Sequence, residues 1–521
     1  MAIGLDYNKA LIATHRFGLG PRGGSAGDLA SAAADPKAFV KAELMRPQAA
    51  LLIGPNLIPA QQALETFFKL QAEVRKQREA NPAAASPAAP AIAANGKAPS
   101  GQVSSAPAPS GANANGAGAS AMASPSAAAM PAASAPATAA SAAPAPEPVD
   151  GKFVQETFRA ETLARQQRQF SAEVGFVERW VAFWSNHFCV SVVKDPFIRL
   201  TAGAYEREAI RPNVFGRFVD LLMAAEKHQA MLHYLDNAQS VGPNSRAGMN
   251  RKLGLNENLA REILELHTLG VAGGYAQEDV TAFARVLTGW TVVGPPGQMG
   301  QPGSFVFNPA AHEPGAQRLL GKTYPEGGLE QGEAVLKDLA RHASTAKFIA
   351  TKLVRHFIAD EPPPALVDRL TKLFRDTDGD LKALALGLLD APESWSTPLT
   401  KIRTPYEFLI ATSRLIGRMP EDPGRINGAV NLLGQPIWQP TGPNGFPDRV
   451  SVWASPEGLK LRLDLANDIG KRLGDAMNPG DLLQIAFGEA ASAQTTQTIR
   501  RAESRPQAMA LLFMSPEFQR R

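Results

Sequence analysis

The sequence contains only one cysteine, Cys189, among its 521 residues. No intramolecular disulfide can therefore form, and the thiol is either a small buried side chain or a reactive one. No run of about 18 apolar residues is present, which excludes an ordinary transmembrane helix. The N-terminus lacks a basic stretch followed by an apolar one, so we expect no signal peptide. These absences predict a cytoplasmic location, unless export with a partner carries the protein to the periplasm.

The motifs that usually identify a reaction are also missing. The sequence has no H-E-x-x-H, no Walker A loop and no paired C-x-x-C. The net charge is only +4, and no long basic run is interleaved with aromatic residues, so nucleic-acid binding is not expected. The sequence alone does not identify a reaction.

Residues 81 to 148 are almost entirely Ala, Pro, Ser, Gly and Asn, without an aromatic residue. Such a segment cannot bury enough apolar surface to offset the entropy lost on ordering. We therefore expect a disordered Ala/Pro-rich insert over residues 81–149. Residues 1–80 would supply the N-terminal helices of the domain that it interrupts, and residues 150–521 the main helical body of that same domain.

Outside this segment, apolar residues recur mostly at helical spacing, and glycine and proline separate the periodic stretches. The expected early helices are 10–15, 26–34, 36–44 and 59–76, and a further one covers 153–168. Strand signals are scarce, and only residues 291–308 could hold a short hairpin. The predicted fold is mainly α, a multi-helix globular domain with at most a small β-hairpin.

The most informative stretch is residues 256–270, which predict a helix with Asn256 as the N-cap and Gly270 just beyond its end. At 100° per residue, Asn258, Arg261 and Glu262 lie on one polar arc, and His267 lies away from it. One interpretation is a solvated face with ion pairs at i,i+4. The other is a pocket wall, in which Arg261 holds Glu262 or Glu265 as a general base or metal ligand.

Three further stretches place polar groups beside apolar segments. Asn186 and His187 lie between aromatic residues, Asp236 and Asn237 follow an apolar helix, and His312 lies in a loop. Each has a structural interpretation. Asn186 and His187 could make buried hydrogen bonds, Asp236 and Asn237 could form a helix-ending turn, and His312 could belong to an ordered loop. Each also has a functional one, because these side chains could orient a substrate or bind a cation.

Taken together, these stretches resemble the bacterial family catalogued as domain of unknown function 1800. The resemblance covers nearly the whole chain apart from the insert. It rests on the segments 17–21, 183–188, 234–237, 256–270, 274–275, 278–280, 284–285, 287–290, 346–350, 404–408, 433–436 and 515–518, and on His312 and Gly321.

The resemblance implies a helical fold but no activity that can be carried over. Members look as if they are encoded beside a second uncharacterised family, numbered 1501, which resembles the alkaline phosphatase and sulfatase superfamily. Those neighbours commonly look like twin-arginine exported proteins. Two departures from the family pattern are the long insert and Glu313, which stands where an aspartate is expected.

Two hypotheses follow. The first is a hydrolase-type enzyme acting on an extended polar substrate such as a glycan. Its cofactor stays open, and a divalent metal would be held by His187, Glu262 and Asp236. The second is a non-catalytic protein that binds a family-1501 partner and is exported with it. For the enzyme, the catalytic candidates are Glu262, His187, Asp236 and His312, and the substrate-binding candidates are Asn186, Asn237, Asn258, Arg261 and Trp290.

Overall fold

A computed structural model describes residues 5–24, 28–80, 149–250 and 254–521. The predicted insert lies outside the described residues, except for Val149, with which a helix begins. Contacts between Cα atoms group residues 1–72 with 149–521 in one compact unit and residues 73–148 in a second. The description below concerns the first unit.

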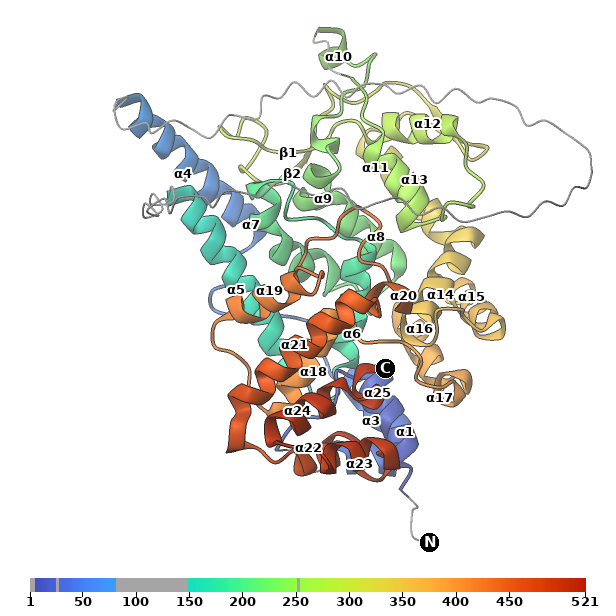
Figure 1. The fold of residues 1–521 in the computed structure, drawn as a ribbon. Coiled ribbons are helices and arrows are strands. Elements are labelled where there is room, and N and C mark those ends of the chain that lie inside the picture. The colour runs from blue at the N-terminus through green and yellow to red at the C-terminus, as the bar shows by residue number, and fades with distance from the viewer. Residues whose placement is uncertain (1–4, 25–27, 81–148, 251–253) are drawn as a thin grey trace, which may run out of the picture. The chain divides into compact units, whose positions relative to one another are not determined.

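The described chain is mainly helical, as predicted (Figure 1). Before residue 81 the helices are α1 (Tyr7–Leu11), α2 (Asp28–Ala34), α3 (Pro36–Leu44) and α4 (Ala60–Ala80). The helices that follow are α5 (Val149–Ser171), α6 (Phe176–His187), α7 (Pro196–Tyr205), α8 (Phe218–Lys227), α9 (Gln229–Tyr234), α10 (Arg246–Asn250), α11 (Asn258–Glu262) and α12 (Gln277–Leu287). The C-terminal part holds α13 (Leu329–Arg341), α14 (Ala343–Phe357), α15 (Pro364–Asp376), α16 (Leu381–Asp390), α17 (Glu393–Ser396), α18 (Pro405–Ile416), α19 (Pro423–Leu432), α20 (Val450–Trp453), α21 (Pro456–Leu473), α22 (Pro479–Phe487), α23 (Ala493–Arg500), α24 (Arg505–Met514) and α25 (Pro516–Gln519). No helix of the described chain has the length and apolar character needed to cross a membrane.

The predicted hairpin is confirmed. Strand β1 (Trp290–Val292) pairs antiparallel with β2 (Phe305–Phe307), so that Trp290 lies opposite Phe307. A second pair, β3 (Gln317–Leu319) with β4 (Lys322–Tyr324), was not expected from the sequence. Its two-residue turn has positive φ at Leu320 (48°) and at Gly321 (77°), and a leucine rarely adopts this conformation.

Helix α6 is the centre of the aromatic core. Trp180 is fully buried, and its ring lies 5.9 Å from the rings of both Phe176 and Phe357. Its indole Nε1 donates to the carbonyl of Val214 at 2.8 Å, so the buried polar atom has a partner. The C-terminal end of this helix carries Asn186 and His187, and the core packing therefore fixes where these two side chains lie.

The N-terminal end of α6 is capped by a carboxylate from α3. Glu43, which is 7% exposed, accepts hydrogen bonds from the backbone N–H groups of Gly175 (3.0 Å) and Val177 (3.1 Å). The free N–H groups at a helix start need such acceptors, and the helix dipole favours a negative charge there. A residue more than 130 positions earlier in the chain thus caps the central helix.

Replacing Glu43 with alanine should lower the free energy of unfolding by about 1–2 kcal/mol, because the capping bonds are lost in a buried place. Urea denaturation of the full chain measures the change. The matched control is Glu156→Ala, since the Glu156 side chain is 64% exposed and, in the part of the chain that the structure describes, pairs only with Lys152 on its own helix. Equal losses in the two variants would contradict the capping role of Glu43.

The predicted helix over residues 256–270 forms, but its second half differs from the expectation. Helix α11 is followed by a π-helical turn, Ile263–His267, in which residues five apart lie one above the other. His267 is 1% exposed and its Nδ1 lies 2.8 Å from a carboxylate oxygen of Glu226, so its side chain is buried, and it also acts electrostatically on Glu262, five residues earlier. The sequence pattern was analysed at 100° per residue, and a π turn changes that angle.

Candidate functional site

The polar site with the clearest chemistry is a cavity of about 100 Å³ that we call the His356 pocket. Its walls come from α5, α6, α14, α18 and the segment 435–448. The polar residues among those that line it are Arg165, Ser185, Asn186, Cys189, His356, Thr404, Tyr406, Glu407, Gln435, Trp438 and Asp448.

His356 and Asp448 form a partly buried pair in this pocket. The Nδ1 atom of His356 lies 2.8 Å from a carboxylate oxygen of Asp448, and the imidazole is 13% exposed. Burial lowers the pKa of His356, although Asp448 acts in the opposite direction. The ring is therefore neutral at pH 7, with its proton on the Nδ1 that faces the carboxylate. The other nitrogen, Nε2, is buried and has no hydrogen-bond partner among the described residues, which leaves its lone pair available as a base.

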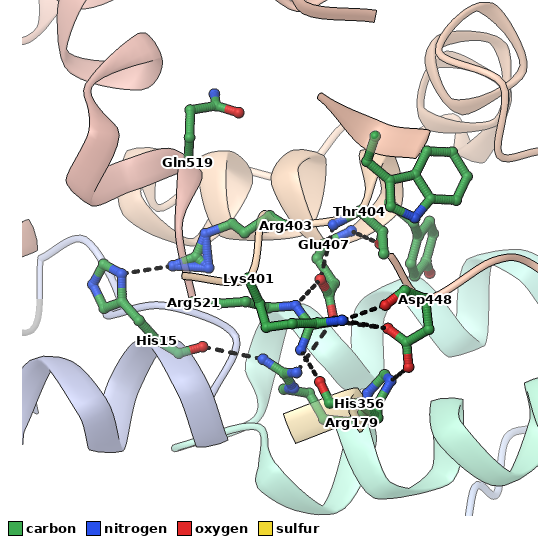
Figure 2. A network of polar contacts seen from close by, with 12 residues as sticks. His15, Arg179, His356, Lys401, Arg403, Thr404, Glu407, Asp448, Gln519 and Arg521 are labelled. Atoms are coloured by element: carbon green, nitrogen blue, oxygen red, sulfur yellow. Dashed lines mark hydrogen bonds and ion pairs between the residues drawn. The ribbon is translucent and has the colours of Figure 1, made fainter. Parts of the chain in front are cut away.

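A network of charges holds Asp448 in place (Figure 2). Lys401 and Arg521 each lie 3.5 Å from its Oδ1. Burial alone would raise the pKa of Asp448, but His356, Lys401 and Arg521 outweigh it and lower that pKa. The carboxylate is thus ionised at neutral pH and can orient the imidazole.

A second carboxylate, Glu407, lies beside the first and faces two arginines. The Arg521 Nε is 2.8 Å from one Glu407 oxygen, and the Arg179 guanidinium is 3.5 Å from the other. Burial opposes ionisation of Glu407, but these two cations lower its pKa to about 2. Figure 2 shows that the network extends to His15, whose Nδ1 lies 2.8 Å from the Arg403 guanidinium. Residues from both ends of the sequence thus meet behind the pocket.

Cys189 lines the pocket but is not activated as a nucleophile. Its thiol donates to the carbonyl oxygens of Pro443 (3.3 Å) and Gly442 (3.6 Å). Burial raises the pKa of the Cys189 thiol to about 12, so the group stays protonated at physiological pH. Of the two interpretations of this cysteine, the structure supports the small buried side chain.

One residue predicted to bind substrate, Asn186, lines the pocket. Its side chain amide donates to the carbonyl of Phe446 at 3.0 Å and accepts from the Phe446 N–H at 2.8 Å, which fixes the 442–447 segment over the cavity. Its neighbour His187 is 2% exposed, and its Nε2 lies 3.1 Å from the carbonyl of His267. Asn186 thus holds a wall of the site, and His187 connects α6 to the π-helical turn.

Glu262 is close enough to Cys189 to raise its pKa, after the larger effect of burial. It is half-buried, and burial raises its own pKa. Among the described residues it has no hydrogen-bond or ion-pair partner. Lys352 also acts on Cys189; it lies one turn before His356 on α14 and therefore on the same helix face. Lys352 and Glu262 thus lie within electrostatic reach of Cys189, although neither belongs to the lining of the pocket.

The other predicted residues lie elsewhere. Asn237 and Trp290 are brought together, because the buried Asn237 amide donates to the carbonyls of Trp290 (3.0 Å) and Leu287 (3.1 Å). The Nδ1 of His312 lies 2.9 Å from the carbonyl of Thr288 in the same segment. These contacts fix the entry to the β1–β2 hairpin.

The remaining candidates are partly or fully exposed. Asp236 pairs with Lys194 at 2.5 Å, and Arg261 pairs with Glu257 at 3.0 Å, as the i,i+4 interpretation predicted. Asn258 is exposed in the first turn of α11. No group of three or more His, Cys, Asp and Glu side chains in the described ranges is placed to hold a metal ion, and this includes His187, Asp236 and Glu262.

Sequence reasoning did not find His356, Asp448, Arg165 or Tyr406. Asp448 and His356 are 92 residues apart, and neither stands in a motif that predicts the contact. Tyr406 lies in the segment 404–408 that contributed to the family resemblance, and this was the one available signal. Thr404 and Glu407 in that segment form a capping box at the start of α18, so a local analysis would have explained it structurally.

The fold and the pocket together define a mainly helical protein with a partly buried histidine–carboxylate site. A family model described as "Protein of unknown function (DUF1800)" matches residues 12–520. The chain therefore belongs to this family, which confirms the resemblance drawn from the sequence. No curated protein and no solved structure matches the chain.

Proposed function

We propose that the protein is a hydrolase-type enzyme in which His356, oriented by Asp448, is the general base. The observation that carries the proposal is a largely buried, neutral imidazole that lines a cavity and whose Nε2 has no hydrogen-bond partner among the described residues. In the reaction, Nε2 takes a proton from water while the water oxygen attacks the substrate. The bond to the leaving group then breaks, and His356 returns the proton to that group.

The size of the pocket constrains the substrate. A cavity of about 100 Å³ has room for one small group and not for a whole sugar residue or peptide. An extended polar substrate such as a glycan would place one substituent in the pocket and lie along the surface beyond it. Lys352 and Glu262 are available to contact that part, and Glu262, with its raised pKa, can exchange a proton there.

The test is an assay of the full chain against nitrophenyl acetate, sulfate, phosphate and glycosides. We expect the wild type to hydrolyse at least one class and His356→Gln to reduce kcat/KM at least about 100-fold, the usual contribution of a general base. The matched control is His342→Gln, which changes the residue just before the same helix and outside the pocket. Hydrolysis that persists undiminished in His356→Gln would refute this role.

Binding of a partner protein is the second candidate, and one groove favours it. A hollow of about 660 Å³ lies between α18, α19 and α21, with an apolar floor that includes Leu409 and Ile469. Arg418, Arg425 and Arg472 lie along it, against the one acid Asp468. The groove suits an amphipathic helix with acidic flanks, which a family-1501 partner would have to supply. Co-purification of that partner, lost on Leu409→Asp, tests this role.

A further inference from the structure

The lining of the His356 pocket includes an arginine that makes no hydrogen bond with any described residue. Arg165 comes from α5, is 8% exposed and lines the cavity. Its guanidinium lies between two aromatic rings, 5.0 Å from the ring centre of Tyr406 and 5.5 Å from that of Trp438. It donates no hydrogen bond to any residue that the structure describes. A guanidinium has five N–H donors, and buried donors are rarely left without acceptors.

Among the described residues, Arg165 forms one ion pair, and its acidic partner is shared with a second arginine. Its Nε lies 3.2 Å from Glu206, but Glu206 also pairs with Arg211 at 3.0 Å. Arg211 pairs in turn with Glu178, and Arg168 also approaches Glu178. Three arginines thus face two glutamates, which leaves one positive charge in excess. Of the three arginines, only Arg165 lines the pocket.

A second donor without a partner lies beside it. Tyr406 is 8% exposed, lines the same cavity, and its hydroxyl has no hydrogen-bond partner among the described residues. Burial raises the pKa of Tyr406 to about 12, so the hydroxyl remains protonated and can donate. Arg165, whose terminal N–H groups donate to no described residue, and the unpaired hydroxyl of Tyr406 therefore both belong to the lining of a single small cavity.

We propose that this pocket binds an oxyanion group of the ligand, namely a carboxylate, sulfate or phosphate, through the Arg165 guanidinium and the Tyr406 hydroxyl. Such a group supplies several acceptor oxygens and the missing negative charge, and its planar or tetrahedral oxygens match the guanidinium fork. Its size also suits a cavity of about 100 Å³. The inference rests on the proposed function only in taking the same pocket as the site, because binding of the anion requires no hydrolysis.

Calorimetric titration at constant ionic strength tests the inference, with acetate, sulfate and phosphate as probes. Acetamide and dimethyl sulfone serve as neutral counterparts of the first two. We expect saturable binding of at least one anion and no binding of the neutral probes. Arg165→Gln should weaken the anion at least about tenfold, and Tyr406→Phe about fivefold or more, because each removes a donor to a charged group. The anion that binds most tightly identifies the class.

The matched control is Arg159→Gln. Arg159 lies on the same helix, is 49% exposed, and pairs with Asp422 outside the pocket, so this variant should bind as the wild type does. Tyr406→Phe should fold as the wild type does, because the hydroxyl that it removes has no hydrogen-bond partner among the described residues. Equal affinity in wild type, Arg165→Gln and Tyr406→Phe would overturn the inference, as would equal binding of the neutral probes. If His356→Gln still binds the anion and the wild type hydrolyses none of the assayed substrates, the proposed function is refuted but the inference of anion binding stands.

Discussion

A Glu407→Gln variant should be less stable than the wild type by about 3–5 kcal/mol, the usual cost of removing one partner from a buried ion pair. The Glu407 side chain is 14% exposed and lies against the buried guanidinium groups of Arg179 and Arg521. Glutamine keeps the shape but removes the charge, so both arginines would remain buried with less compensation. The free energy of unfolding from urea denaturation at pH 7 measures the loss.

The matched control for this prediction is Glu393→Gln. Glu393 pairs with Arg369, whose side chain is 47% exposed, and a pair in contact with solvent contributes at most about 1 kcal/mol. If the two variants lose the same amount, the network behind the pocket is no more important to stability than a surface pair. If only Glu407→Gln lowers the free energy of unfolding, the ion-pair network beside the pocket also contributes strongly to the stability of the fold.

The second large effect is a loss of stability as the pH falls from 7 to 5. Burial lowers the pKa of His15 to about 3, and Arg403 acts in the same direction. The unfolded chain takes up a proton at this histidine below pH 6.5, but the folded chain does so only near pH 3. The free energy of unfolding therefore decreases throughout this interval, by about 2 kcal/mol at pH 5 from His15 alone.

His187 adds a loss of the same sign, because burial also holds its pKa well below the usual value. Glu407, with a pKa of about 2, contributes stability above pH 4.5 that is lost only as the pH falls toward 2, so it does not affect the interval from 7 to 5. Urea denaturation at several pH values measures the slope. His15→Gln should flatten it, and an unchanged slope in that variant would contradict the assignment to His15.

Much of the fold could be predicted from the sequence, because helix formation is mostly a local property. The sequence predicted α3 at its observed bounds, and it predicted a hairpin over residues 291–308, one residue after Trp290, where β1 begins. The π-helical turn Ile263–His267 and the second hairpin could not be predicted, because no local residue pattern specifies them. The turn at Leu320 in particular requires a conformation that leucine disfavours on its own.

The candidate site was less predictable, because its parts come from distant positions. Local patterns identified Asn186, which lines the pocket, and Glu262, which has the raised pKa expected of an acid–base group. Whether Glu262 acts in catalysis stays a prediction. The pairing of His356 with Asp448 and of Arg165 with Tyr406 depends on tertiary packing, which no single segment encodes.

The surroundings of Cys189 make this residue a reporter of local opening in the wall of the pocket. With a thiol pKa of about 12, only about one molecule in ten thousand carries the reactive thiolate at pH 8 while the fold is closed. Alkylation therefore requires that the backbone of residues 442–443 first separates from the Cys189 sulfur. As in hydrogen exchange, the labelling rate then gives the free energy of that opening. A chain with one thiol needs no engineered probe for this measurement, and ligands that close the pocket should slow the reaction.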